Sequence, residues 1–262
     1  MTGRRTRWLP GAMLGIVAAA LAGCAGPART SAARPALGAN TLNVAETALA
    51  GNRPDLALHV ADAVLKLDPG NARARLIHGD AAYLLGDCPT ATRDYTALLG
   101  TAPHDARAEI GLGRCALRGG GRGAVTAFRQ ATRDDPHSAV AFNDLGVALS
   151  QRGAFAAAAP AFRRALALRP DFRAARANLG LAMALGGNAG AGAAVIAPLA
   201  QGGPISAPER ADYAAALALS GQHGAARRVL DATMPAAEAD DVETRMARLA
   251  ARPASGAKRA VN

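Results

Sequence analysis

The stretch HSAVAFNDLGVALSQRGAFAAAAPAFRRALALRP, residues His137–Pro170, is the clearest copy of a unit that recurs along this chain of 262 residues. Each copy closes on a proline, and successive closing prolines are 34, 33, 34 and 34 residues apart. Prolines scattered through unrelated loops would not keep such a period. The chain is therefore predicted to be an array of one repeated structural unit, with closing prolines at Pro69, Pro103, Pro136, Pro170 and Pro204.

The residues inside this unit suit a pair of closely packed helices. Gly146 and Ala158 lack side-chain bulk where the two helices would cross, so Phe162 can fill the space beside them. Gly153 lies between the helices, where a residue of positive φ can end the first one. Pro170 lacks the backbone donor needed to continue the second. Each unit is predicted to be a helix, a turn and a second helix.

The order of these residues resembles the tetratricopeptide repeat (TPR), a helix-turn-helix unit of about 34 residues. The matching residues are Leu145, Gly146, Ala158, Phe162 and Pro170. The resemblance implies an all-α fold, a right-handed superhelical TPR solenoid of about five to six helix-turn-helix repeats. We predict the array over residues 40–238, with five repeats and a degenerate sixth, and a C-terminal capping helix with a basic disordered tail over 239–262.

Two copies depart from the pattern. Pro160 falls early in the second helix of the best copy, which predicts a late helix start or a local distortion there. In the copy that closes at Pro204, Gly192 and Ile196 replace the Ala and the aromatic residue of the second helix. We expect that helix to be the most loosely packed.

The N-terminus carries an export signal. Three arginines within residues 4–7 precede an apolar run over 8–21, a pattern typical of a secretory signal peptide over residues 1–23. The sequence Leu-Ala-Gly-Cys over 21–24 resembles the lipobox of bacterial lipoproteins, which implies that Cys24 is lipidated. In that family, a residue other than Asp after the Cys implies the outer membrane, so Ala25 implies an outer-membrane lipoprotein facing the periplasm. An ordinary signal peptide with a chance Cys is the alternative.

Residues 24–39 are rich in Ala, Pro, Arg and Gly, and we predict a flexible tether there. The chain has a formal net charge of +10, which falls to +7 without the signal peptide. A basic exported protein could meet anionic lipid headgroups, acidic polymers or an acidic patch on a partner. Nucleic acid is not an expected partner, because the one Trp lies in the signal peptide and no stacking platform remains.

Cys88 and Cys115 remain once Cys24 is assigned to the lipid anchor. They fall on helices that should be antiparallel neighbours, and export would place them where disulfides persist. A disulfide between them and two free thiols are equal alternatives at this point.

The chain shows no motif that indicates catalysis. Its five histidines have no metal-binding spacing, and the glycine run over 119–123 is not followed by the Lys-Ser or Lys-Thr of a phosphate-binding loop. No Gly-x-Ser-x-Gly nucleophile motif occurs. We therefore predict no catalytic residue, no metal, no cofactor, no small-molecule substrate and no enzymatic activity.

The TPR resemblance implies a concave groove, lined by the first helix of each repeat, that binds a segment of a protein partner. Its first half is basic and apolar, which suits an acidic and apolar peptide. The alternative is that its arginines are ordinary surface charges. The residues predicted to contact the partner are Arg73, Asp80, Tyr83, Arg107, Arg114, Asn143 and Asn178.

The combination of lipobox, short tether and TPR array resembles the TadD lipoproteins of tight-adherence (Flp) pilus machines and related pilotin-type pilus-assembly lipoproteins. That resemblance implies a periplasmic scaffold that helps to assemble a pilus or secretion apparatus, with a protein such as a secretin as its partner. A lipid-anchored adaptor for cell-wall hydrolases or for outer-membrane protein assembly is the alternative.

Overall fold

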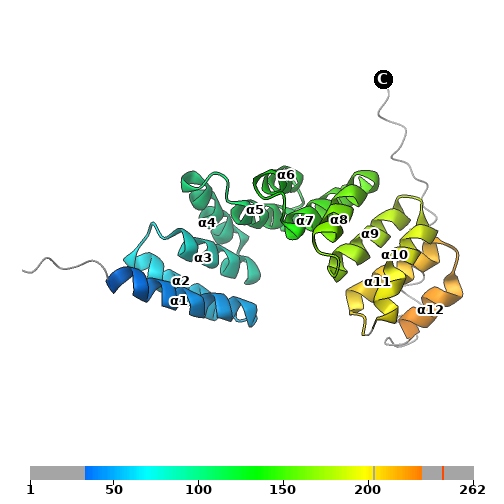
Figure 1. The fold of residues 1–262 in the computed structure, drawn as a ribbon, viewed down its shortest axis with the longest axis horizontal. Coiled ribbons are helices and arrows are strands. Elements are labelled where there is room, and N and C mark those ends of the chain that lie inside the picture. Colours follow the sequence, from blue (N-terminus) through cyan, green and yellow to red (C-terminus); the bar gives the residue numbers. More distant parts are fainter. Residues whose placement is uncertain (1–32, 203, 232–243, 245–262) are drawn as a thin grey trace, which may run out of the picture.

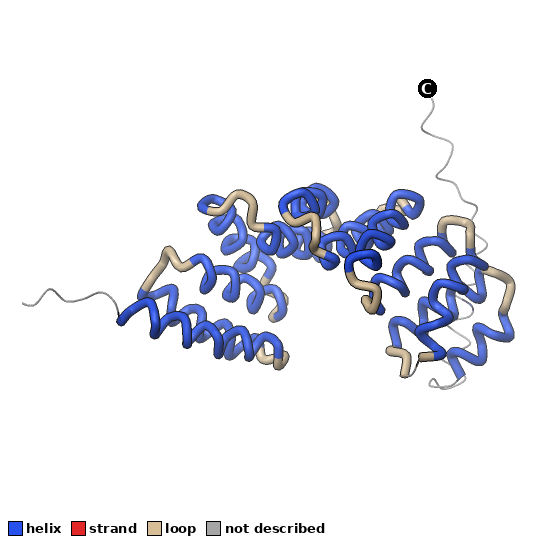
Figure 2. Tube along the Cα trace, in the orientation of Figure 1, coloured by secondary structure: helices blue, strands red, loops and turns tan. Residues whose placement is uncertain are grey.

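The computed structural model describes residues 33–202, 204–231 and 244. Within these residues the chain forms α-helices and no strand, as predicted (Figure 2). None of the helices in this part of the chain has the length and apolar character that a membrane span requires. The signal peptide, Cys24 and almost all of the predicted C-terminal capping helix and tail lie outside the described residues.

The twelve helices found there form six consecutive pairs, which we number as repeats 1 to 6. The first helices of repeats 1 to 6 are, in order, α1 (Ala33–Ala50), α3 (Ala72–Leu84), α5 (Ala106–Arg118), α7 (Ala139–Gln151), α9 (Arg173–Leu185) and α11 (Ala207–Leu219). The second helices are, in the same order, α2 (Pro54–Leu67), α4 (Cys88–Thr101), α6 (Ala124–Asp134), α8 (Phe155–Leu168), α10 (Ala189–Gln201) and α12 (His223–Asp231).

Two helix boundaries differ from the expectation. Helix α1 begins at Ala33, so residues 33–39, which were expected to belong to the tether, are helical. Helix α8 begins at Phe155 and runs through Pro160, so of the two alternatives expected there, the late helix start is wrong. Pro160 is the sixth residue of that helix, beyond its first turn, so its missing backbone donor leaves the Ala156 carbonyl without its usual partner four residues on.

The turns between paired helices use residues with positive φ. Gly153 has a φ of 71°, as its place in the sequence predicts, and the same role falls to Asn52, with a φ of 54°, in repeat 1. Asn and Gly are the residues that accept this conformation at least cost. Side-chain caps then start several of the helices: the side chains of Asn71, Asp105 and Ser138 each accept a hydrogen bond from a backbone N–H in the first turn.

In repeats 2 to 4, an aromatic ring of the second helix lies against a glycine of the first. A Cβ built on Gly146 would lie 2.5 Å from Cε1 of Phe162, and one on Gly113 would lie 2.6 Å from Cε1 of Phe128. Both rings are fully buried. The glycines therefore make room for the rings, and each ring is central to the core of its repeat.

The first helices line the inner side of the array. Each first helix contacts the first helix of the next repeat, from α1 to α11, whereas none of the described second helices contacts another. The array consequently curves into an arch, with α1 and α12 near its two ends and α5 to α8 at its crown (Figure 1). The surface formed by the first helices is the concave face expected of a TPR solenoid.

Candidate protein-binding groove

The concave face contains a hollow of about 410 Å³ between α3, α5 and α7, which we call the central hollow. Four of the seven predicted groove residues line it, namely Asp80, Tyr83, Arg107 and Arg114. The remaining walls are mostly apolar and come from Leu49, Leu84, Tyr95, Ile110, Gly111, Ser138 and Val140. The central hollow thus combines apolar walls with a few charged groups, a composition suited to holding part of a peptide.

Asp80 is the acidic group of the central hollow. Its carboxylate accepts a hydrogen bond of 2.8 Å from the Tyr95 hydroxyl and lies 3.6 Å from Nη2 of Arg107. Burial raises the pKa of the Asp80 carboxyl, and the tyrosine hydrogen bond and the nearby arginines oppose that shift. Burial and the Asp80 charge in turn raise the pKa of Tyr95, so its hydroxyl stays protonated and remains a donor.

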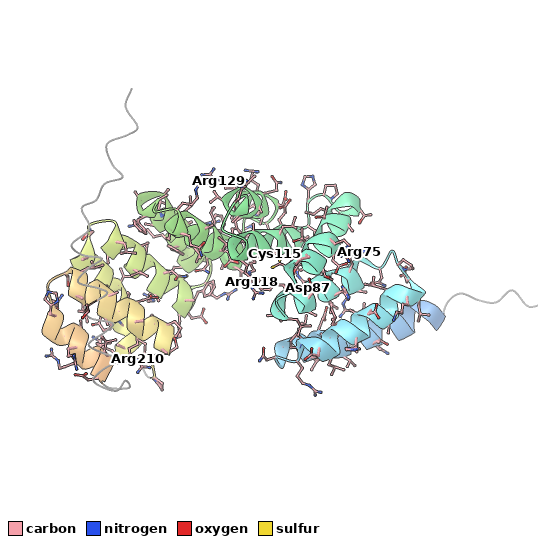
Figure 3. The ribbon with its side chains drawn as sticks, turned by 180° about the vertical axis from the view of Figure 1, so that it is seen from behind. Arg75, Asp87, Cys115, Arg118, Arg129 and Arg210 are labelled. Atoms are coloured by element: carbon pink, nitrogen blue, oxygen red, sulfur yellow. The ribbon has the colours of Figure 1, made fainter. Side chains whose placement is uncertain are left out.

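Tyr83 is held by a residue that the sequence analysis missed. The guanidinium of Arg118 lies 4.1 Å from the centroid of the Tyr83 ring, and its Nη1 donates a 2.6 Å hydrogen bond to the Tyr83 carbonyl. Arg118 is at the end of α5, one repeat further along the chain, on the side of the arch that faces its opening (Figure 3). Its distance of 35 residues from Tyr83 is close to one repeat length, which is the only signal in the sequence that could have indicated the contact.

The predicted groove arginines are partnered by carboxylates of the neighbouring repeats. Arg73 donates to both carboxylate oxygens of Glu46 on α1, at 2.9 and 2.7 Å, and Nε of Arg114 donates to Asp144 on α7 at 2.7 Å. Arg107 and Asp80 make the equivalent contact between α5 and α3. The positive charge predicted for the first half of the groove is therefore largely offset by these acids.

Asn143 and Asn178 form an uncharged contact of the same kind between the next two first helices. Nδ2 of Asn178 on α9 donates a 3.0 Å hydrogen bond to Oδ1 of Asn143 on α7. Asn143 is buried, and its own Nδ2 donates to Asp144 at 3.1 Å. At the last junction, Arg173 on α9 pairs with Glu209 on α11 through two contacts of 3.0 Å. A polar link thus joins each first helix to the next along the whole concave face.

Two residues of the central hollow remain most available to a partner. The side chain of Arg107 is 62% exposed in spite of its contact with Asp80. Leu84 is 47% exposed, which is high for a leucine beside a core. An exposed cation next to an exposed leucine can contact a segment that presents an acidic and an apolar side chain.

The histidines and cysteines considered in the sequence lie outside the central hollow. His78 contacts the buried Asp94 at 2.6 Å, and His104 contacts Asp134 at 2.9 Å. The described part of the chain contains no group of three or more His, Cys, Asp or Glu residues placed to hold a metal ion. Cys88 and Cys115 are free thiols on the neighbouring helices α4 and α5.

Comparison with solved structures supports this fold. PilW, a widely conserved type IV pilus biogenesis factor, is 20% identical with a TM-score of 0.69, over 80% of this chain and 98% of that chain. PilF of Pseudomonas aeruginosa is 16% identical with a TM-score of 0.68, over 81% and 99%. A thermophilic TPR protein of Thermus thermophilus is 22% identical with a TM-score of 0.59, over 69% and 99%. At these identities the likeness concerns the fold alone.

The sequence comparison is more specific. No curated protein sequence matches the chain. The family model described as tetratricopeptide repeat matches residues 43–91, 78–122, 118–171 and 143–204, which together span more than half of the chain. This chain belongs to the tetratricopeptide repeat family.

Proposed function

We propose that this protein is a periplasmic TPR scaffold, anchored to the outer membrane through Cys24, that binds a protein partner during assembly of a Flp/Tad-type pilus or secretion apparatus. The observation that carries the binding role is the central hollow, where Arg107 and Leu84 are exposed beside apolar walls on the concave face. The pilus context rests on the lipobox resemblance and on the fold shared with PilW. A secretin is the expected partner.

The partner would lie along the first helices and place an apolar side chain in the central hollow. An acidic group on the same segment would pair with Arg107, whose contact with Asp80 is long enough at 3.6 Å to be exchanged. Arg114 is a poorer contact, because its Nε is already held by Asp144 at 2.7 Å. The binding energy would therefore come from burial of apolar surface, with the charge selecting the segment.

Cross-linking in intact envelopes, followed by capture of this protein, tests the proposal. The double variant Arg107→Ala with Leu84→Ala is expected to lose the captured partner at least about ten-fold, since both side chains are exposed and leave the core unchanged. The matched control is Arg129→Ala with Leu67→Ala, an exposed pair on second helices outside the central hollow. Equal losses in both variants would contradict binding in the central hollow.

The identity of the captured protein separates the two functions. A secretin or another pilus component supports assembly of a pilus or secretion apparatus. Capture of cell-wall hydrolases or outer-membrane assembly proteins would instead favour the alternative function, a lipid-anchored adaptor for those proteins. The anchor is tested separately with Cys24→Ser, which is expected to leave the membrane fraction because it cannot be acylated.

A further inference from the structure

Two thiols meet at the junction between repeats 2 and 3. Cys88 is the first residue of α4, and Cys115 lies on the neighbouring helix α5. Both line a second hollow, of about 570 Å³, whose other walls are Pro89, Thr92, Leu112, Ala116, Gly123 and Ala127. Cys88 is among the groups that raise the pKa of the Cys115 thiol, which fits two side chains that lie near each other in this hollow. Two cysteines from different repeats therefore line the same hollow at this junction.

The two thiols differ in access. Cys115 is only 6% exposed, whereas Cys88 is partly exposed at the start of its helix. Burial, together with the neighbouring Cys88, raises the pKa of the Cys115 thiol to about 12. Cys115 therefore stays protonated in the reduced protein, and a reagent from solvent meets Cys88 first.

We propose that Cys88 and Cys115 form a reversible disulfide that joins repeats 2 and 3, with Cys88 as the entry thiol and Cys115 as the resolving thiol. The oxidant is an external disulfide, either a small molecule or a thiol-disulfide exchange protein. This inference does not depend on the identity of the partner in the proposed function.

The exchange balances in two steps. The Cys88 thiolate attacks the external disulfide, forms a mixed disulfide and releases one thiolate, which takes up the proton that Cys88 lost. Cys115 then attacks Sγ of Cys88, and its proton passes to the second departing thiolate. The protein loses two hydrogens, and the external disulfide is reduced to two thiols.

The bond would cross the same junction as the contacts that shape the central hollow. Asp80 with Arg107 and Tyr83 with Arg118 also join repeat 2 to repeat 3. These contacts are non-covalent and partly exposed, whereas a disulfide would link α4 to α5 covalently for as long as the protein stays oxidised. Oxidation is therefore expected to restrain the spacing of the walls of the central hollow.

Redox titration of the full-length chain carrying Cys24→Ser tests the bond, because that variant keeps only the two thiols in question. Equilibration with oxidised glutathione is expected to remove two hydrogens from the intact mass and to link the peptides that contain Cys88 and Cys115. Dithiothreitol should reverse both changes. Two alkylatable thiols after equilibration, or a link found only between two molecules, would overturn the proposal.

Single variants test the order of attack. With Cys115→Ala in the same background, glutathione should accumulate on Cys88 at least about ten-fold faster than it does on Cys115 in Cys88→Ala. Circular dichroism melts check that both variants are folded. Equal rates, or faster reaction at Cys115, would contradict the assigned roles.

Amide hydrogen exchange tests the restraint. Oxidation is expected to slow exchange in α4 and α5 and to leave α9 and α10 unchanged, since those helices lie two repeats away and serve as an internal control. Identical exchange in the two redox states would show that the bond does not restrain the junction.

Discussion

Repeats 4 and 5 reach the same helix-turn-helix shape by different packing. In repeat 4 the Phe162 ring lies against Gly146, so a flat side chain separates the two helix backbones. In repeat 5 Ile196 stands in place of the ring, and a Cβ on Gly192 would lie 2.3 Å from the carbonyl oxygen of Gly180, so the backbones themselves are in contact. Ile196 fills the remaining space and is fully buried. We expected this helix to be loosely packed, yet its backbone lies closest to its partner where Gly192 meets Gly180.

Repeats 4 and 5 differ in which atoms can move when a substitution adds volume between the two helices. A ring can tilt about its χ angles, and neighbouring side chains can adjust around it. A helix backbone can move only together with the rest of its helix. Repeat 5 should therefore tolerate added volume less well than repeat 4.

Gly192→Ala is expected to have the largest effect. Its new Cβ would meet the Gly180 carbonyl and the backbone nitrogen of Ala184, which lies 2.9 Å away. Separation of α9 from α10 should lower the free energy of unfolding by about 3 kcal/mol, even though alanine is a better helix former than glycine. Urea denaturation followed by circular dichroism measures the change.

Gly190→Ala is the matched control in the same helix. A Cβ at Gly190 meets nothing within 4 Å, so helix propensity alone should act and stabilise the protein by up to about 1 kcal/mol. Similar effects of the two substitutions would show that the backbone contact in repeat 5 has no energetic importance.

Gly146→Ala should have a smaller effect, about 1 to 2 kcal/mol, because the Phe162 ring can tilt away from the added methyl group. The double variant with Phe162→Leu should be less destabilised than the sum of the two single variants, since leucine leaves space for the methyl. The same denaturation measurement decides the point. Additive effects would mean that the ring and the glycine are not coupled.

The polar links offer a finer comparison between the two halves of the array. Arg173→Ala removes both contacts to Glu209, a buried carboxylate whose pKa the arginine holds below its usual range. Arg107→Ala removes one long contact, and Asp80 keeps its bond to Tyr95. The midpoint temperature of thermal unfolding should therefore fall further for Arg173→Ala than for Arg107→Ala. A larger shift for Arg107→Ala would reverse the ranking of the two links.

Repeat 2 should contribute a pH-dependent stability, because His78 stands there in place of the leucine found before the motif glycine in repeats 3 to 5. The hydrogen bond to Asp94 raises the pKa of His78, with support from Asp62 and opposition from burial and Arg75. A raised pKa means that the stabilisation is complete below about pH 6.5, the ordinary histidine value. It is then lost as the pH rises through the folded-state pKa.

The contribution of His78 is the smallest of the predicted effects. It is measured as the change in the free energy of unfolding between pH 5.5 and pH 8.5. The parent protein should lose more stability over this range than His78→Leu does. Burial raises the pKa of Asp212 to about 6, so that residue titrates in the same direction, and the difference between parent and variant cancels its contribution. Equal pH dependence in both proteins would exclude His78 as the source.

Much of the fold was predictable because the repeat period records it directly. The closing prolines set the repeat boundaries, and Gly153 and Phe162 took the roles that their chemistry suggests. The start of α1 was not predictable in the same way, because no motif residue precedes it. The groove residues were predictable as positions on a helix face, and four of the seven share the central hollow.

What the sequence alone determined is the architecture: an all-α array of TPR units whose first helices form one face, because small residues and prolines at a fixed period allow one packing. The tertiary structure decided the partners across each junction. Arg107 lies 27 residues from Asp80, Arg118 lies 35 residues from Tyr83, and Cys115 lies 27 residues from Cys88, so the residues of each pair belong to successive repeats. Their meeting depends on the angle between successive repeats, a quantity that the sum of many side-chain contacts sets and that no single motif encodes.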